Sequence, residues 1–228
     1  GLHEIQSFFC LIDLVDRINI NKIKGNKDKI KFIGPFAKSV NKTNNSILSL
    51  LKLLRKLRFI SNYYSVLVKK NIPVFGGLGG GTSNAAAILK FLLKKKINES
   101  LLNKTEDLIG SDLRLFFYKQ GFLKNLKSVV QVKKKQKLFF VLVQPKIRYS
   151  TKEIYAKVRE YSKKKQYSEN KINTKKKFIS FFTKNKNDLQ SIVEKKYPQI
   201  KKLLIDINNE KDCSFSRMTG SGSVCYGL

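Results

Sequence analysis

The feature of this sequence that most constrains its fold is a cluster of glycines that runs directly into a helix-forming segment. Five glycines lie within residues 76–81, and "NAAAILKFLLKKK" follows from Asn84. Glycine is about 1 kcal/mol less favourable than alanine inside a helix, and it loses the most backbone freedom on folding. Such a cluster is expected where the backbone turns tightly or where a ligand approaches it closely.

The residues after the cluster predict a helix that begins near Thr82 or Ser83, and either hydroxyl can cap its first N–H groups. The positive end of this helix would point toward the glycines, whose bare backbone lets an anion approach. A tight turn between a strand and a helix is the plain alternative, and it is preferred for an isolated glycine cluster. Because the cluster, the two hydroxyls and the alanine-rich helix agree, the segment is predicted to bind phosphate.

Two common phosphate-binding motifs do not fit this segment. A P-loop requires a lysine directly after its last glycine, whereas the first lysine here is Lys90, well inside the predicted helix. A dinucleotide-binding fingerprint requires a third glycine at the position that Thr82 occupies. The predicted anion site therefore belongs to another family.

The composition is strongly basic, with a formal net charge of +31 over 228 residues. Such a charge ordinarily indicates a nucleic-acid partner. Here the lysines are spread along the chain in short runs, such as 94–96 and 133–135, with few arginines and no basic stripe interleaved with aromatic residues. We therefore predict no nucleic-acid partner, but a surface that attracts anionic nucleotides in a salt-sensitive way.

The spacing of the cysteines and the length of the apolar runs indicate in which cellular compartment the protein is expected. Cys10, Cys213 and Cys225 have neither disulfide-framework nor metal-ligand spacing, which favours a reduced cytoplasmic compartment, or a plastid if the source is a eukaryote. The longest strand-like apolar runs, such as 138–143, are far too short to span a bilayer, so no membrane partner is predicted.

The periodicity along the chain predicts an α+β protein with a domain boundary near residue 136. Thr43 and Asn44 are candidate caps for the first helix. The expected helices lie at 45–57, from 82 onward, and at 100–109, 151–161, 178–182, 189–195 and 199–208. The expected strands lie at 8–20 (one strand or a pair), 29–36, 63–74, 113–118, 128–132 and 137–145, with a final strand, glycine turn and strand.

Several segments together resemble one family, the GHMP small-molecule kinases. The pattern P-x-x-x-G-L-G-G-G-[ST]-S-N-A-A at 73–86 resembles their ATP loop in its long form. Further similar segments follow in the family's order and cover nearly the whole chain: "GLHEIQSFF" from Gly1, "GSDLRLFF" from Gly110, "YSTKEIY" from Tyr149, "NDLQSIVEKKYPQI" from Asn187 and "RMTGSGSVCYGL" from Arg217. The resemblance implies a two-domain GHMP kinase fold, with an ATP-loop domain at 1–136 and a ferredoxin-like C-terminal domain at 137–228.

The resemblance also implies an activity: ATP-dependent phosphorylation of the 2-hydroxyl of a cytidyl diphosphate of methylerythritol, a step of isoprenoid precursor synthesis. The implied cofactors are ATP and Mg²⁺, the implied partner is a small molecule, and the protein is expected to be a monomer or homodimer. Three alternatives stay open. They are a family kinase acting on mevalonate, homoserine or a sugar, an inactive nucleotide-binding remnant, and a noncatalytic RNA-binding module.

Asp112 is the predicted catalytic base. By residue type alone, an aspartate between Gly110 and an apolar run is an ordinary cap or turn residue. The resemblance instead implies that it orients the acceptor hydroxyl and finally accepts its proton, and Thr82 or Ser83 is the implied Mg²⁺ ligand. The implied ATP-binding residues are Pro73, Val74, Phe75, Gly76, Gly77, Leu78, Gly79, Gly80, Gly81, Thr82 and Ser83.

The resemblance implies six substrate-binding residues. His3 would read the edge of the cytosine, Lys70 would lie near the substrate phosphates, and Thr151 would supply a hydroxyl. Tyr155 could stack on the base, and the remaining two residues, Gly220 and Gly222, would form a second glycine loop. Each has a structural alternative: a histidine satisfied within a strand, a solvated lysine, packing on one helix face, and a plain hairpin turn.

The sequence departs from the family pattern at several places. Leu2 stands where the family has a tyrosine, and Arg114 and Leu115 replace a proline and a hydrophobic residue. The family's opening P-A-K-I-N strand, which carries a lysine and an asparagine of the site, and its closing helix are not found. The sequence is therefore expected to be an incomplete record of a full enzyme or a decayed gene product.

Overall fold

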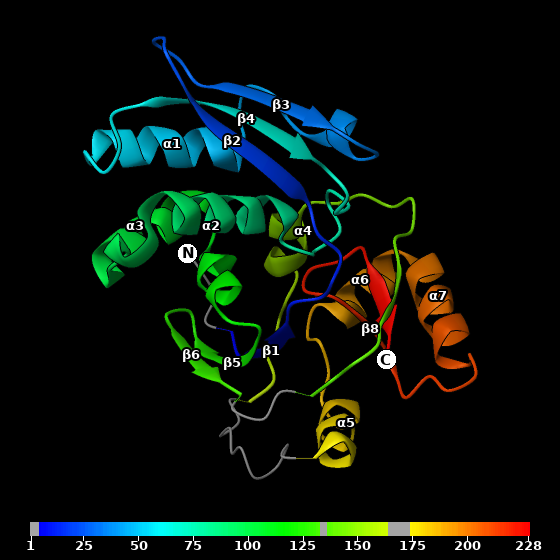
Figure 1. The fold of residues 1–228 in the computed structure, drawn as a ribbon. Helices are drawn as coiled ribbons and strands as arrows, with labels where there is room; N and C mark the ends of the chain where they lie inside the picture. The colour runs from blue at the N-terminus through cyan, green and yellow to red at the C-terminus, as the bar shows by residue number, and fades with distance from the viewer. Residues whose placement is uncertain (1–4, 133–135, 164–173) are drawn as a thin grey trace. The chain divides into compact units, whose positions relative to one another are not determined.

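The computed structural model describes residues 5–132, 136–163 and 174–228, and its chain divides into two compact units (Figure 1). The first unit holds the residues up to Val74 and Gly79–Gln131. The second holds Phe75–Leu78 and the residues from Val132 onward. The glycine cluster is thus shared by the two units, because Gly76 and Gly77 belong to the second and Gly79 to the first.

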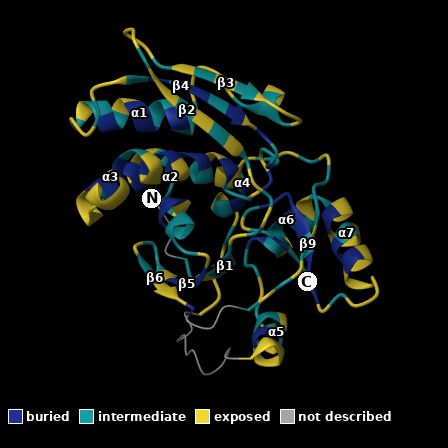
Figure 2. Cartoon of the chain, viewed as in Figure 1, coloured by how far each residue is buried: buried dark blue, intermediate teal, exposed yellow. Residues whose placement is uncertain are grey.

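The described residues of the first unit form two three-stranded sheets. In one, β4 (Tyr63–Lys69) lies between β2 (Arg17–Ile23), which is antiparallel to it, and β3 (Lys29–Ile33), which is parallel. Buried and half-buried residues alternate along β4, as expected for a strand with one face on a core (Figure 2). The other sheet is antiparallel, in the order β1 (Ser7–Cys10), β5 (Gln120–Asn125), β6 (Ser128–Gln131).

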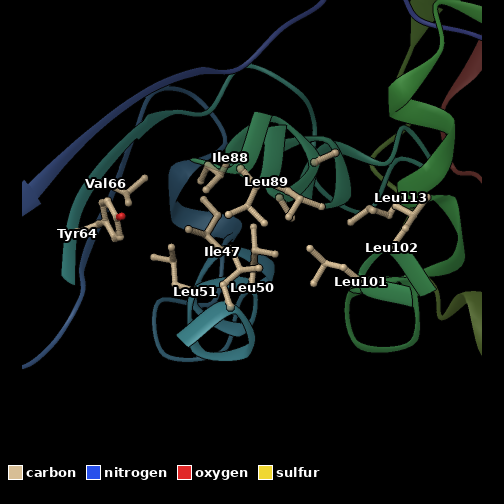
Figure 3. Close-up of a cluster of buried hydrophobic side chains, with 14 of the residues drawn as sticks. Ile47, Leu50, Leu51, Tyr64, Val66, Ile88, Leu89, Leu101, Leu102 and Leu113 are labelled. Carbon is tan, nitrogen blue, oxygen red and sulfur yellow. The ribbon is translucent and has the colours of Figure 1, made fainter. Parts of the chain in front are cut away.

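The helices of the first unit pack on the buried face of β4, and α1 and α2 lie on one side of its sheet (Figure 1). Side chains from β4, α1, α2, α3 and η3 form a single cluster, of which Leu50, Leu89 and Leu113 are fully buried (Figure 3). Each such side chain contributes about 1.5–3 kcal/mol relative to exposure. The helical elements are η1 (Ala37–Ser39), α1 (Ser46–Lys56), α2 (Gly80–Leu93), η2 (Lys94–Lys96), α3 (Glu99–Ile109) and η3 (Ser111–Phe117).

In its described residues, the second unit combines a small antiparallel sheet with four helices. Its sheet has the order β7 (Val141–Val143), β9 (Cys225–Gly227), β8 (Ser216–Met218). A separate apolar cluster includes Ile154, Val193, Ile200 and Met218. The helices are α4 (Thr151–Ala156), α5 (Lys175–Thr183), α6 (Gln190–Lys196) and α7 (Pro198–Asn208).

The mixed α+β class is confirmed, and so are the strand pair within 8–20 and the final strand, turn and strand. The strand predicted at 113–118 is wrong, because this segment forms η3, in which Leu113 N donates to Gly110 O at 3.1 Å. The strand β5 was not predicted, and the strand predicted at 137–145 is reduced to β7. The assignment of 1–136 and 137–228 as domains stays a prediction.

Two helix starts also differ from the predictions. The cap of α1 is Asn45, whose Oδ1 accepts a hydrogen bond from Leu48 N at 3.1 Å, and not Thr43 or Asn44. The helix α2 begins at Gly80, so Thr82 and Ser83 lie inside its first turn rather than capping it. Within the described residues, no helix is both long and apolar enough to cross a membrane.

Candidate active site

The N-terminus of α2 is left open to a ligand. The neighbouring helices α1 and α3 are capped by side chains, through Asn45 and Asn98, whereas no side chain of the described residues caps α2. The first N–H groups of a helix have no acceptor within it. At α2 these amides belong to residues 80–82, where the helix dipole adds positive potential. An anion is the ligand that such a helix start favours.

The glycines at this helix start are required by the packing beneath them. Gly79 has φ +65°, and a Cβ added there would lie 2.8 Å from the ring of Phe116. A Cβ added at Gly80 would lie 2.9 Å from both Lys70 Nζ and a methyl group of Ile72. The loop is therefore drawn tightly onto the protein on one side, with the helix amides still uncapped.

Lys70 lies under this helix start in a buried ion pair. Its ammonium donates to Asp16 Oδ2 at 2.5 Å, and the two side chains are 4% and 1% exposed. The other carboxylate oxygen of Asp16 accepts from the backbone N–H of Asn71 and Ile72, at 2.7 and 2.8 Å, and Asn84 Nδ2 donates to Oδ2 at 2.8 Å. Asp16 thus ties the segment before the glycines to the first turn of α2. The predicted contact of Lys70 with a substrate phosphate stays a prediction.

Asp112 lies in the first turn of η3, not before a strand as predicted. A Cβ added at Gly110 would lie 3.7 Å from Thr82 Oγ1, so the starts of η3 and α2 are neighbours. Within the part of the chain that the structure describes, no hydrogen bond or ion pair engages the Asp112 carboxylate. Desolvation by surrounding protein raises the pKa of this carboxyl, although the residue is exposed and water reaches it. We therefore expect only a small rise.

Arg114 holds η3 in place from within the protein. The guanidinium donates to both oxygens of Glu106, at 2.8 and 3.0 Å, and to Lys127 O at 2.6 Å. The hydrogen bond to Glu106 raises the pKa of the arginine, so the pair is charged. At the other end of η3, Lys90 Nζ donates to Phe116 O at 2.8 Å. The arginine that replaces the family's proline is therefore an anchor of the segment that carries Asp112.

The two candidate Mg²⁺ ligands differ in their bonding. Ser83 Oγ donates to Gly80 O at 2.9 Å and keeps lone pairs for a ligand. Thr82 is half-buried, and its hydroxyl takes part in no hydrogen bond within the described residues. No group of three histidine, cysteine or acidic side chains suited to a metal ion occurs among these residues. Mg²⁺ in phosphoryl-transfer sites typically takes one or two protein ligands and the substrate phosphates, so two hydroxyls at a phosphate-binding helix start fit that role.

In the second unit, the first part of the glycine cluster is clamped by the loop between β8 and β9. Val224 N donates to Gly76 O at 3.2 Å. A Cβ added at Gly77, whose φ is +71°, would lie 2.6 Å from Thr219 O and 2.9 Å from Gly222 O. Only glycine fits this approach of one loop to the other.

The predicted second glycine loop lies beside the predicted substrate hydroxyl. Thr151 Oγ1 and Ser221 Oγ are 2.9 Å apart. A Cβ added at Gly222 would overlap the hydroxyl of Tyr149, and Asn187 Nδ2 donates to Gly220 O at 2.7 Å. The loop is thus more than a plain hairpin turn, because two separate segments, at 149–151 and at Asn187, contact it.

Two predicted substrate residues are placed less directly. Tyr155 is half-buried and packs against the apolar cluster of the second unit, so part of its ring serves the core. Stacking of Tyr155 on a base stays a prediction. His3 lies outside the described residues.

Three residues that support the site were not predicted from the sequence. Asp16 is separated from Lys70 by 54 residues, and no local pattern marks it. Asn84 follows the glycine loop and was interpreted only as the start of the helix. Asn187 opens a segment similar to the family, which could have indicated its importance, but its two carbonyl partners lie about thirty residues further along the chain.

Comparison with known protein families and solved structures identifies the class of protein to which this fold belongs. Residues 45–109 match the family described as "GHMP kinases N terminal domain". A crystal structure of 4-(cytidine 5'-diphospho)-2C-methyl-D-erythritol kinase matches with a TM-score of 0.71 at 21% identity, over 100% of this chain and 82% of that one. L. major mevalonate kinase matches with a TM-score of 0.64 at 12% identity, over 99% and 81%. The fold is therefore that of the GHMP small-molecule kinases.

Sequence comparison with curated relatives identifies the family within this class of kinases. The chain is 36% identical to the 4-diphosphocytidyl-2-C-methyl-D-erythritol kinase of Pelagibacter ubique, over 97% of this chain and 79% of that protein. It is 30% identical to the enzyme of the same name from Wolbachia pipientis wMel, over 100% and 81%. The chain belongs to the 4-diphosphocytidyl-2-C-methyl-D-erythritol kinase family.

Proposed function

We propose that this protein uses ATP to phosphorylate the 2-hydroxyl of 4-diphosphocytidyl-2-C-methyl-D-erythritol, in the methylerythritol phosphate route to isoprenoid precursors. Two curated relatives from different bacteria carry the name of that kinase and align with nearly the whole chain. The observation that carries the chemistry is the uncapped, glycine-opened start of α2, which neighbours the segment of Asp112.

ATP supplies the phosphoryl group, and the first turn of α2 is the proposed seat of its phosphates. The amides of residues 80–82 would donate to phosphate oxygens, because no side chain in the described part of the chain caps this helix start. Thr82 and Ser83 are the proposed Mg²⁺ ligands. Val74, Phe75 and the other loop residues predicted to bind ATP directly precede this helix start along the chain.

Asp112 is proposed to orient the acceptor hydroxyl and to take its proton. An ionised carboxylate is a far weaker base than an alkoxide, so Asp112 accepts the proton late, as the bond to phosphorus forms. Its main contribution is to hold the oxygen in line, and the charge that develops on the phosphoryl oxygens is stabilised by the amides of α2. A carboxylate that no other group among the described residues engages suits this task.

The acceptor is proposed to bind through the remaining predicted residues. Thr151 and the loop of Gly220 and Gly222 would contact the polar part of the substrate. Tyr155 and His3 would contact the cytosine, and Lys70 would act on the phosphates through the field of its ion pair rather than by a free ammonium.

The test is Mg²⁺-dependent ATP consumption by the wild-type chain with the cytidyl substrate, compared with mevalonate and homoserine. Turnover of the cytidyl substrate alone is the expected result. Turnover of mevalonate or homoserine instead would contradict the proposed substrate.

Asp112→Asn should lower kcat by about 10²–10⁴ with an unchanged unfolding midpoint, because the side chain is exposed. Asp107→Asn, at an exposed aspartate of α3, is the matched control and should keep wild-type activity. Because the reaction needs ionised Asp112, kcat/KM should fall as the pH drops through a pKa somewhat above the ordinary aspartate value. An Asp112→Asn variant with wild-type kcat would refute the assignment of the base.

A further inference from the structure

Phe75 is an unusual residue for its position. It has φ +61°, in the left-handed region where bulky side chains are rare, and it is 56% exposed. Because most of the side chain is exposed, little apolar surface is buried to offset the free-energy cost of the strained backbone. Strained residues of this kind persist where the surrounding structure fixes them, and they concentrate at ligand-binding sites.

The surroundings that fix Phe75 lie directly after it in the second unit. Gly76 O accepts from Val224 N, and Gly77 packs against Thr219 O too closely for any side chain. These contacts define the backbone path of the glycine loop. The ring of Phe75 is left at the surface, beside the guanidinium of Arg148, whose carbon lies 5.5 Å from the ring centroid.

Arg148 is a cation without a carboxylate partner in the described part of the chain, and it is exposed. The residue after it is fixed: the ring of Tyr149 stacks on that of Tyr197 at 5.2 Å, and its hydroxyl lies against Gly222. Three residues after Arg148, Thr151 contacts Ser221 of the second glycine loop. The guanidinium thus lies beside Phe75 at the start of the ATP loop, three residues before the predicted substrate hydroxyl of Thr151. The contacts of Tyr149 and Thr151 fix the backbone that carries it.

We propose that Arg148, oriented by the ring of Phe75, binds a diphosphate group of the reacting nucleotides. The proposal rests on the proposed function and names a further binding residue of that site. A guanidinium held against an aromatic face keeps its N–H groups in plane and available, and its fork matches phosphate oxygens in a bidentate way. The diphosphate belongs either to the nucleotide donor or to the cytidyl acceptor, and the two sources are separable by experiment.

The first test is the effect of Arg148→Gln on each KM. The variant should raise the KM for the substrate whose diphosphate Arg148 binds by roughly tenfold or more, since a charge-assisted bidentate contact is lost. The other KM and the unfolding midpoint should change little. Arg148→Lys should recover only part of the loss, because a lysine lacks the planar fork. Lys146→Gln, at an exposed cation of the same loop, is the matched control and should leave both KM values unchanged.

The second test separates binding from folding at Phe75. Phe75→Gly should keep or raise the unfolding midpoint, since glycine adopts this backbone without strain, while the same KM rises about two- to fivefold. In the Arg148→Gln background the substitution should have no further effect on KM. Phe139→Ala, at another exposed phenylalanine that lies beside a lysine, should change neither quantity.

Calorimetry of ADP and of CDP binding tests the proposed role of Arg148 separately from the proposed function, because it measures binding without turnover. If the wild-type chain binds a nucleotide diphosphate but does not turn over the cytidyl substrate, the proposed function fails while the loss of affinity in Arg148→Gln still supports this site. If Arg148→Gln and Lys146→Gln bind both nucleotides and turn over as the wild type does, the site is refuted. A lowered midpoint in Phe75→Gly with unchanged KM would assign Phe75 to folding alone.

Discussion

The two units fix the elements around their glycine loops by different chemistry. In the first unit, buried ion pairs do so: Asp16 with Lys70 under α2, and Arg114 with Glu106 behind η3. In the second unit the comparable anchors are aromatic rings and side chain to backbone hydrogen bonds. There Tyr149 stacks on another tyrosine ring, and Asn187 donates to two carbonyl groups.

The difference indicates what each unit has to control. A buried ion pair is directional and loses its stabilisation steeply when one partner is absent, so it holds a helix start in one geometry. Stacked rings and neutral hydrogen bonds lose less stability when one partner is removed, because no unpaired charge is left buried. Precise placement by buried charges suits the amides and the carboxylate that are proposed to act on the phosphoryl group.

The largest effect on stability is expected for Asp16→Asn. The substitution leaves the Lys70 ammonium buried beside a neutral amide, and breaking a buried pair in this way costs about 3–5 kcal/mol of unfolding free energy. Asp13→Asn, at an exposed aspartate three residues earlier, is the control and should change stability little. Denaturant unfolding of both variants measures the difference. Equal stability of the two variants would contradict the statement that this buried ion pair fixes the elements around the glycine loop of the first unit.

A smaller effect is expected for Arg114→Lys. The ammonium keeps the charge opposite Glu106 but cannot make the two parallel hydrogen bonds and the bond to Lys127 O, so about 1–3 kcal/mol is lost. Because η3 carries Asp112, kcat should fall while the KM for ATP stays constant. Arg217→Lys is the matched variant of the second unit, where the guanidinium donates to the backbone carbonyls of Phe182 and Asn185, at 2.9 and 2.6 Å. Its kcat should be unaffected.

The local part of the site could be predicted from the sequence, and the nonlocal part could not. The glycine cluster, the helix after it and the helices at 45–57 and 199–208 are encoded within a few residues of each other. By contrast, the apolar run that looked like a strand at 113–118 is drawn into η3 by Arg114, whose partners are the buried Glu106 of α3 and the backbone oxygen of Lys127 in the turn between β5 and β6. Asp16 shows the same limit, since its role depends on a lysine 54 residues away.

A further effect, at high pH, separates the two units through their thiols. Burial raises the pKa of Cys225 to about 12 and that of Cys10 to about 11, from an ordinary value near 9.0. Above pH 9 the unfolded thiol ionises while the folded one keeps its proton, so stability falls as pH rises toward the folded pKa. The slope is about 1.4 kcal/mol per pH unit for one fully coupled group. The folded pKa of Cys225, in the second unit, lies about one unit above that of Cys10, in the first unit. The fall in stability should therefore continue to a pH about one unit higher in the second unit.

Cys225→Ala should flatten this alkaline fall in stability. Its absolute stability also changes, because the side chain is fully buried, so the slope between pH 9 and 11 is the quantity to compare. Val224→Ala removes buried methyl groups beside it without removing a titratable group, and should keep the wild-type slope. An unchanged slope in Cys225→Ala would show that burial of this thiol does not control the pH dependence.

The smallest effect is expected at the ion pairs on the surface of the second unit. Glu153 contacts both Lys196 and Lys157, and the hydrogen bond from Lys196 lowers the pKa of its carboxyl. All three side chains are open to water, which screens their charges, so the pairs hold no element in place. Glu153→Gln should leave the unfolding midpoint unchanged at low and at high salt. A midpoint that drops at low salt alone would mean that surface charge contributes to the second unit, and the contrast with the buried pairs of the first unit would then be one of degree.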